Sequence, residues 1–404
     1  MTESRRQIAY FSPLPPTRSG IADYSAELLP YLAKAARITL FVEDPAQVAE
    51  NLRAAFETRP IADFARVYWQ YDVALYQMGD SLCHEAMYPV LLRFPGVTVL
   101  HDHGLHHFVA TRTIPRGDFA SYVRELGYAL GIAGVDLAYR IQRGKAEHPF
   151  YTAPLNERVL DRSLGVIVHS RYAADQIRAV RPHLPVAVVP APISACIESL
   201  RSRQELACPE DALLFVSAGQ VISNKQLTLA LEAFARLRAD YPQARYVVVG
   251  DELKHDLDLP AWLAQRGLGD GVTMTGYLAD KRDFISWIAA ADVVVNLRYP
   301  TVGETSATAL RGLAAGRPVI VSNHGWYAEL PDDVCVKVTP NDGEAVYQAM
   351  RRLAGDAMLR QAIGRRAAAY AQREHSLAAA ARKYIDFVDE IIERVSGRAE
   401  QMTA

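Results

Sequence analysis

The chain has 404 residues, of which 50% are hydrophobic and 22% are charged, and its formal net charge at pH 7 is -2. This length favours two domains over a single core, and the composition is that of a globular protein rather than a disordered one. Because positive and negative charges nearly balance, no basic tail for nucleic acid is indicated, and we expect no nucleic-acid partner.

Cysteine usage and the apolar runs indicate the compartment. Cys83, Cys196, Cys208 and Cys335 show no metal-binding spacing and are too few for a disulfide framework, which fits a reducing cytosol. Residues 1–13 lack the apolar core of a signal peptide, and no uninterrupted apolar run approaches the ~18 residues of a spanning helix. We therefore expect a cytoplasmic protein that is not integral to a membrane.

The first half alternates short apolar strands with helices, which predicts a doubly wound α/β sheet. Strands are expected at residues 8–11, 37–44, 72–79, 97–102, 163–170 and 186–193, and a helix at 81–94. After the first strand, Ser19 and Gly20 precede a helix, where a residue without a side chain lets the backbone approach a ligand. The loop has neither the GxGxxG nor the GxxxxGK[ST] spacing, so by itself it is a weak signal.

A histidine-rich segment, HDHGLHHF at residues 101–108, follows the fourth predicted strand directly. Metal ligation, a hydrogen-bonding or acid/base role for His101 with Asp102, and a structural role all remain open. Active-site groups gather at this edge of an α/β sheet, whereas neither HExxH nor a cysteine partner is present. The pattern therefore favours His101 and Asp102 as candidate catalytic residues over a metal site.

The stretch at residues 122–144 is apolar and contains glycines, so it suits either a core helix or a helix that leans on a membrane. Its apolar residues are not segregated from a face rich in Lys and Arg, as an interfacial helix requires. We therefore expect a core helix.

The second half restarts the pattern after a linker expected at residues 190–209. Strands are predicted at residues 212–220, 244–252, 272–278, 291–296 and 317–322. Gly219 ends the first of these and Lys225 stands at the start of the next helix, from which it can reach a phosphate in the crevice. After 291–296, Thr305 or Ser306 can cap a helix of small residues whose N–H groups suit an anion, and Glu304 beside them suits sugar hydroxyl groups. A phosphorylated or nucleotide-linked sugar meets both demands. The end of the chain, at residues 359–395, reads as two helices.

Six segments in order carry a resemblance to a known family, namely SPLPPTRSGIADYS, VLHD, GQVISNKQLTLALEAF, VVVGD, VTMTGYL and GETSATALRGLAAGRPVIV. Together the sequence resembles the family-4 glycosyltransferases of the GT-B architecture, in which two Rossmann-like domains face each other across a cleft. The resemblance implies an acceptor domain at 1–195, a nucleotide-sugar domain at 205–372, and a C-terminal helix at 373–397 that crosses back to the first domain.

The resemblance also assigns roles to residues. It implies that Gly20, Gly219, Lys225, Thr305 and Ser306 lie near the donor diphosphate. His101 and Asp102 would face the transferred sugar, Glu304 would hold its hydroxyl groups, and Tyr277 would border the base. Gln220 replaces the family's arginine, and Arg311 replaces its second glutamate, so either Arg311 or Arg298 is a candidate phosphate contact.

The implied activity is that of a retaining hexosyl- or deoxyhexosyltransferase. It would move a sugar from a nucleoside diphosphate sugar to a glycan or lipid-linked acceptor, without cofactor or metal, in the synthesis of cell-surface polysaccharide or glycoconjugate. Peripheral contact with the inner face of the cell membrane is compatible with this setting. Two alternatives remain: a non-catalytic subunit that binds sugar nucleotide or glycan, and a nucleotide-sugar epimerase of the same fold.

Overall fold

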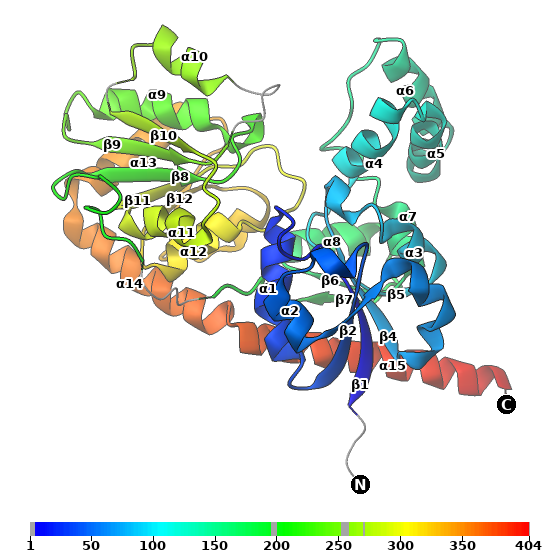
Figure 1. Cartoon of the computed structure of the whole chain (residues 1–404). Helices are drawn as coiled ribbons and strands as arrows, with labels where there is room; N and C mark the ends of the chain where they lie inside the picture. The colour runs from blue at the N-terminus through cyan, green and yellow to red at the C-terminus, as the bar shows by residue number, and fades with distance from the viewer. Residues whose placement is uncertain (1–4, 195–199, 252–257, 270, 404) are drawn as a thin grey trace. The chain divides into compact units, whose positions relative to one another are not determined.

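The computed structural model describes residues 5–194, 200–251, 258–269 and 271–403. By its internal contacts the chain divides into two compact units. The first comprises Met1–Pro192, Val302–Thr305 and Leu377–Ala404, and the second comprises Ile193–Thr301 and Ser306–Ser376. Each unit is a parallel sheet with helices (Figure 1), which confirms the predicted α/β class.

The first unit is built on a seven-stranded sheet of order β3-β2-β1-β4-β5-β6-β7. Its strands are β1 (Arg6–Phe11), β2 (Ala36–Val42), β3 (Glu57–Pro60), β4 (Val73–Met78), β5 (Gly96–Leu100), β6 (Ser163–Val168) and β7 (Val186–Val188). Every neighbouring pair is parallel, and all of β4 and β5 is buried, as expected for a sheet covered on both faces. The polar edge strand β3 was not predicted.

The helices of the first unit are α1 (Gly20–Leu32), α2 (Glu50–Ala55), α3 (Tyr88–Arg93), α4 (His106–Thr113), α5 (Phe119–Leu130), α6 (Ile132–Gln142), α7 (Glu157–Arg162), α8 (Arg171–Val180) and α15 (Leu377–Thr403). The single helix expected at 81–94 is a short turn, η4 (Leu82–His84), followed by α3. The last helix, α15, joins this unit: Tyr384, Phe387 and Val388 are buried in one apolar cluster with α1 and the sheet. The Tyr384 hydroxyl also lies 2.6 Å from that of Tyr24.

The prediction of a core helix at 122–144 is wrong, because the segment forms two helices that are largely exposed. Gly131, with a φ of 64°, separates α5 from α6. Ile132 is 89% exposed and Leu130 is 41% exposed. A Cβ on Gly134 would lie 2.0 Å from the Leu126 carbonyl oxygen, so the two helices pack tightly on each other. They bury that shared side and extend beyond the carboxyl edge of the sheet (Figure 1).

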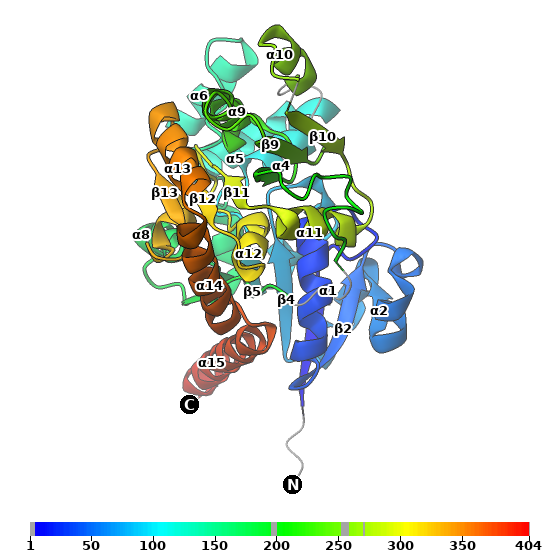
Figure 2. The same cartoon turned by 90° about the vertical axis from the view of Figure 1, so that its left-hand side faces the viewer.

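The second unit is built on a six-stranded sheet of order β10-β9-β8-β11-β12-β13. Its strands are β8 (Leu214–Ala218), β9 (Arg245–Val249), β10 (Val272–Gly276), β11 (Val293–Asn296), β12 (Val319–Ser322) and β13 (Val336–Val338), and its helices are α9 (Leu227–Leu237), α10 (Leu259–Gln265), α11 (Lys281–Ala290), α12 (Ala307–Ala314), α13 (Gly343–Gly355) and α14 (Ala357–Glu374). Helices α12 and α14 lie side by side (Figure 2). All neighbouring strands are again parallel. The strand β13 was not predicted.

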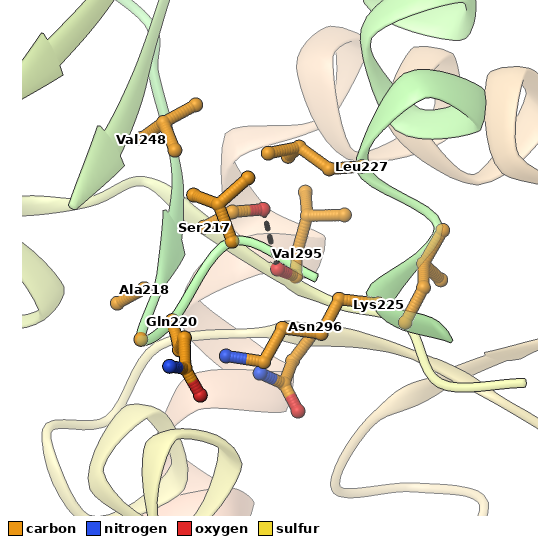
Figure 3. A pocket seen from close by; sticks show the side chains of 11 residues that line it. Ser217, Ala218, Gln220, Lys225, Leu227, Val248, Val295 and Asn296 are labelled. Atoms are coloured by element: carbon orange, nitrogen blue, oxygen red, sulfur yellow. Dashed lines mark hydrogen bonds between the residues drawn. The ribbon is translucent and has the colours of Figure 1, made fainter. Parts of the chain in front are cut away.

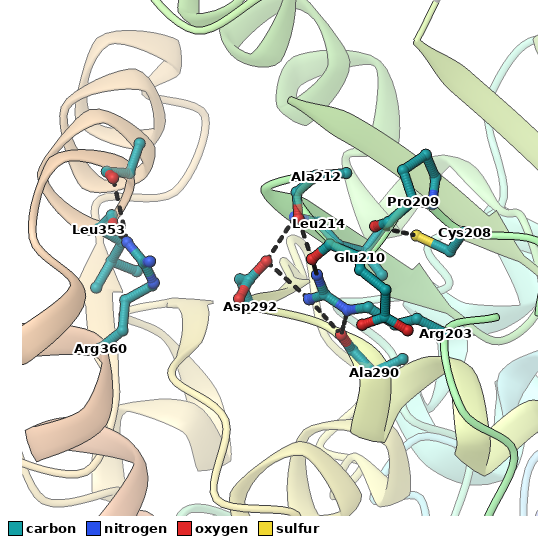
Figure 4. Close-up of polar contacts among 11 residues, drawn as sticks. Arg203, Cys208, Pro209, Glu210, Ala212, Leu214, Ala290, Asp292, Leu353 and Arg360 are labelled. Atoms are coloured by element: carbon teal, nitrogen blue, oxygen red, sulfur yellow. Dashed lines mark hydrogen bonds and ion pairs between the residues drawn. The ribbon is translucent and has the colours of Figure 1, made fainter. Parts of the chain in front are cut away.

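The segment that enters the second unit is fixed by Arg203 (Figure 4). Its guanidinium donates to the carbonyl oxygens of Ala290 and Ala212 and pairs with Asp292 at 2.8 Å. Asp292 in turn accepts the Leu214 N–H at the start of β8. Within the predicted linker at 190–209, residues 195–199 lie outside the described residues.

Within the described ranges, no helix is long and apolar enough to cross a membrane. Cys83, Cys208 and Cys335 are free thiols. Cys196 lies outside the described residues.

Because two histidines are buried, we expect the protein to lose stability in acid. Burial lowers the pKa of both His84 and His106 to about 4, and both side chains are 0% exposed. Below about pH 6.5 the unfolded chain binds protons that the folded chain does not, so the free energy of unfolding falls as the pH drops toward 4. We expect a fall of about 3 kcal/mol per pH unit from the two residues together.

Urea unfolding between pH 7 and pH 4.5 measures this slope. His183 is exposed, so His183→Gln is the matched control and should leave the slope unchanged, whereas His84→Gln should reduce it. A free energy of unfolding that stays constant over this range would contradict the prediction.

Candidate active site

Side chains from adjacent strands form a hydrogen-bonded row at the carboxyl edge of the first sheet. Gln77 lies on β4, His101 follows β5 and His169 follows β6. The Gln77 side chain lies 2.8 Å from Nε2 of His101, and Nδ1 of His101 lies 3.2 Å from Nε2 of His169. Nδ1 of His169 lies 2.8 Å from the carbonyl oxygen of Val189, just after β7. We call these four groups the strand-end row.

The row fixes which ring nitrogens carry protons. A carbonyl oxygen only accepts, so Nδ1 of His169 carries the proton, and Nε2 of a neutral His169 accepts from Nδ1 of His101. Burial, and then the His169 ring, lower the pKa of His101 well below its usual range, so His101 is also neutral. Its Nε2 therefore accepts, which requires the Gln77 amide to present its N–H group there.

Both ring nitrogens of His101 are engaged by protein groups, which disfavours proton exchange with a substrate. The Tyr24 ring packs edge-on against the imidazole, with the ring centroids 4.8 Å apart. The role of His101 toward a substrate stays a prediction.

Replacing His169 tests the strand-end row. His169→Ala leaves the half-buried His101 Nδ1 without its acceptor, and an unsatisfied buried group costs about 1–3 kcal/mol. If His101 orients the substrate, we expect turnover to fall about 10- to 100-fold with little change in KM for the donor. His169→Gln restores a donor and an acceptor and should recover most of the rate. Equal losses in both variants, or a change confined to thermal stability, would contradict the role.

The remaining residues of the histidine-rich segment have structural partners. Asp102 accepts the Asp80 N–H at 2.8 Å, and Asp80 in turn contacts His107 at 2.8 Å. His106 is fully buried and lies 2.8 Å from both the Ala153 carbonyl oxygen and the Tyr122 hydroxyl. In the described ranges no group of three or more His, Cys, Asp or Glu is arranged to hold a metal ion. Metal independence stays a prediction.

The candidate residues of the first loop lie at the start of α1. Ser19 is the N-cap, and its hydroxyl accepts the Ile21 N–H at 3.2 Å. Gly20 is the first helical residue and is exposed, and a Cβ there would meet no atom within 4 Å. Open space beside an exposed helix start is what close approach of a ligand to the backbone requires.

Glu304 lies in the segment Val302–Thr305, which belongs to the first unit by its contacts. The Gly104 N–H donates to the Val302 carbonyl oxygen at 2.8 Å, which ties this segment to the loop after His101. The Glu304 carboxylate accepts the Val302 N–H at 2.9 Å. Its charge also raises the pKa of Tyr172, after burial as the larger cause. This electrostatic influence of Glu304 on Tyr172 was not predictable from the sequence, in which the two residues are far apart.

In the second unit, Lys225 and Gly219 meet at the carboxyl end of β8. Gly219 has a φ of +99°, and a Cβ there would lie 2.7 Å from Nζ of Lys225 and 3.6 Å from Oγ1 of Thr308 on α12. A pocket opens at this point, and Figure 3 shows the Lys225 side chain extending from its loop toward the end of β8. A cation, a glycine and a helix start together form a suitable site for an anion.

The remaining candidate residues lie at or beside helix α12 and after strand β10. Ser306 is the N-cap of α12: its hydroxyl accepts the Ala309 N–H and donates to Asn296 Oδ1. Thr305, the alternative cap, is instead the residue before it and belongs to the first unit by its contacts; its buried Oγ1 has no partner among the described residues. Arg311 is half-buried in α12, and Tyr277 follows β10 and is 47% exposed.

Comparisons with known proteins match this architecture. Residues 210–356 match the family described as glycosyl transferases group 1. D-inositol 3-phosphate glycosyltransferase of Stackebrandtia nassauensis is 34% identical over 137 residues, which are 32% of this chain and 30% of that protein. The match thus spans about a third of this relative.

Two solved structures share the fold over nearly the whole chain. Sucrose-phosphate synthase (tll1590) from Thermosynechococcus elongatus superposes with a TM-score of 0.69 at 17% identity and covers 96% of this chain and 100% of its own. Anabaena Alr3699/HepE, in complex with UDP, gives 0.66 at 15% identity over 95% and 100%. At these identities the likeness shows the fold, which confirms the predicted two-domain architecture.

Proposed function

We propose that the chain transfers a sugar from a nucleoside diphosphate sugar to a glycan or lipid-linked acceptor. The match of residues 210–356 to the family described as glycosyl transferases group 1, together with the GT-B fold, supports this proposal. We further propose that the sugar keeps its anomeric configuration and that the product belongs to a cell-surface polysaccharide or glycoconjugate. The observation that carries the proposal is the meeting of Lys225, Gly219 and the start of α12 at the end of β8.

In the proposed reaction an acceptor hydroxyl oxygen forms a bond to the anomeric carbon of the donor sugar. The bond from that carbon to the diphosphate oxygen breaks with its electron pair, and the hydroxyl proton passes to the departing diphosphate. Lys225 and the N–H groups at the start of α12 would stabilise the developing negative charge, and the N–H groups beside Gly20 are the candidates of the first unit for the same role. Preorganised donors of this kind contribute roughly 3–4 kcal/mol.

The other candidate residues would act on the sugar and the base. Glu304 would accept hydrogen bonds from sugar hydroxyls, and His101 with Asp102 would orient the sugar. Tyr277, exposed at the end of β10, would border the base. Arg311 would add positive charge where Gln220 supplies none. We propose that no metal ion is required, and that the protein acts in the cytoplasm or peripherally at the membrane.

The experiment is release of nucleoside diphosphate by the purified protein from UDP-, GDP-, dTDP- and ADP-sugars, alongside binding of each donor. Slow hydrolysis of one donor would identify it and support the transferase. Gln220 is exposed and lines the pocket, and it leaves the site with one cation fewer than an arginine at this position would give. This favours a binding subunit as the second candidate function. Absence of both binding and turnover would reject the transferase, and conversion of a donor sugar without nucleotide release would indicate the epimerase.

A further inference from the structure

A cavity of about 640 Å³ lies in the first unit at the carboxyl edge of its sheet. Its walls come from the segments that follow β1, β2, β3 and β4, represented by Leu14, Glu43, Ile61 and Met87. From β1 the strand order runs to β2 and β3 on one side and to β4 and the later strands on the other, so the topological switch point lies between β1 and β4. Open α/β sheets bind ligands at this switch point, and the volume is in the range of small-molecule sites.

The walls combine apolar surface with groups that accept hydrogen bonds. Leu14, Val48, Ile61 and Met87 supply the apolar part. Such a mixture suits a sugar, whose C–H faces pack on apolar side chains while its hydroxyls need polar partners. The lining of the cavity therefore suits a polyhydroxy compound.

The charges of the lining are all negative. Glu43 and Asp44 line the cavity, and within the described part of the chain no Lys, Arg or His lines it. Asp44 is held in place, because it accepts the Ala46 N–H and the Gln47 side-chain amide, each at 2.9 Å. Glu43 is exposed. A phosphate or carboxylate in this cavity would face two carboxylates without a compensating cation, which is unfavourable.

We propose that this cavity receives the acceptor of the transfer reaction, and that the part lodged there is a sugar or polyol without phosphate or carboxylate, on which an amino group is favoured. The inference rests on the proposed function and adds the chemical class of the acceptor. Glu43 is the specificity-determining residue, because it lines the cavity and is exposed, while Asp44 accepts hydrogen bonds within its own turn.

Binding of three small probes, without donor, tests the proposal: glucosamine, glucose and glucose 6-phosphate, titrated at pH 7 and low salt and followed by ligand-observed NMR. We expect glucosamine to bind tightest and glucose 6-phosphate weakest, with about a fivefold step in Kd for each change of charge. Glu43→Gln should remove the advantage of glucosamine over glucose, and Glu43→Lys should make glucose 6-phosphate the tightest ligand.

Glu147→Lys is the matched control, because Glu147 is an exposed carboxylate of the same unit that does not line the cavity. It changes the net charge equally and should preserve the wild-type order. The proposal is overturned if wild-type protein prefers glucose 6-phosphate, if Glu43→Lys keeps the wild-type order, or if none of the three probes binds. Nucleotide release by wild-type protein separates the two levels: release without the expected probe order rejects only this inference, whereas no release from any donor rejects the proposed function.

Discussion

Lys225→Ala is expected to slow release of nucleoside diphosphate by about 10²- to 10³-fold, which is the effect of removing one preorganised donor from a developing oxyanion. Lys225 is the one charged side chain among the described residues that line the pocket at the end of β8. Because the lysine faces Gly219 at the end of a buried strand, the variant removes charge and little apolar packing. Steady-state kinetics on the best donor measures the loss.

Lys145→Ala provides the control for this variant, since Lys145 is exposed in the first unit and far along the chain from the donor candidates. It should retain the wild-type rate. Thermal unfolding of both variants should resemble that of wild type. A Lys225→Ala protein that is folded and hydrolyses donor at an undiminished rate would show that the anion site lies elsewhere.

Glu304→Ala is expected to lose transfer by about 10²-fold or more while the protein stays folded, because hydrogen bonds to a charged group are worth about 1.5–3 kcal/mol each and the carboxylate would bind more than one sugar hydroxyl. Affinity for the free nucleoside diphosphate should stay unchanged, since the proposed contact is with the sugar. Calorimetry with nucleotide and a transfer assay measure the two quantities.

Glu304→Gln separates the charge of this residue from its structural hydrogen bond. The amide oxygen of glutamine still accepts the Val302 N–H, so the local turn is preserved. We expect an intermediate loss for this variant. If Glu304→Ala unfolds, or transfers sugar at the wild-type rate, the assigned role is wrong.

Both sheets could be predicted from sequence because their central strands are continuous apolar runs. A strand such as β11, VVVN, is buried on both faces and needs no alternating pattern. The edge strand β3, ETRP, has neither a continuous apolar run nor an alternation of apolar and polar residues. Only its pairing with β2 makes it a strand. The helices α5 and α6 were misread as core because apolar content alone does not say which side is covered, and the break at Gly131 lacks a proline or polar cluster.

The candidate site was predictable where it depends on the ends of strands. Gly219, Lys225 and Thr308 meet because β8 ends beside α12, an arrangement that strand order implies. The partner of His101 was harder to find, since His169 is 68 residues away in sequence. The usable signal was positional: His101 follows β5 as His169 follows β6, and parallel neighbours end at one edge. Hydrogen-bond directions along the row required the atomic arrangement.

The return of α15 to the first unit affects how the protein is made. Residues 1–192 leave the ribosome without the helix that covers Tyr24 and completes their apolar cluster. Translation of the intervening residues, up to Leu377, takes roughly 10–40 s at ordinary elongation rates, and during that time the apolar surface awaiting α15 is exposed to water. A truncation before Leu377 therefore removes part of the amino-terminal core rather than a dispensable tail.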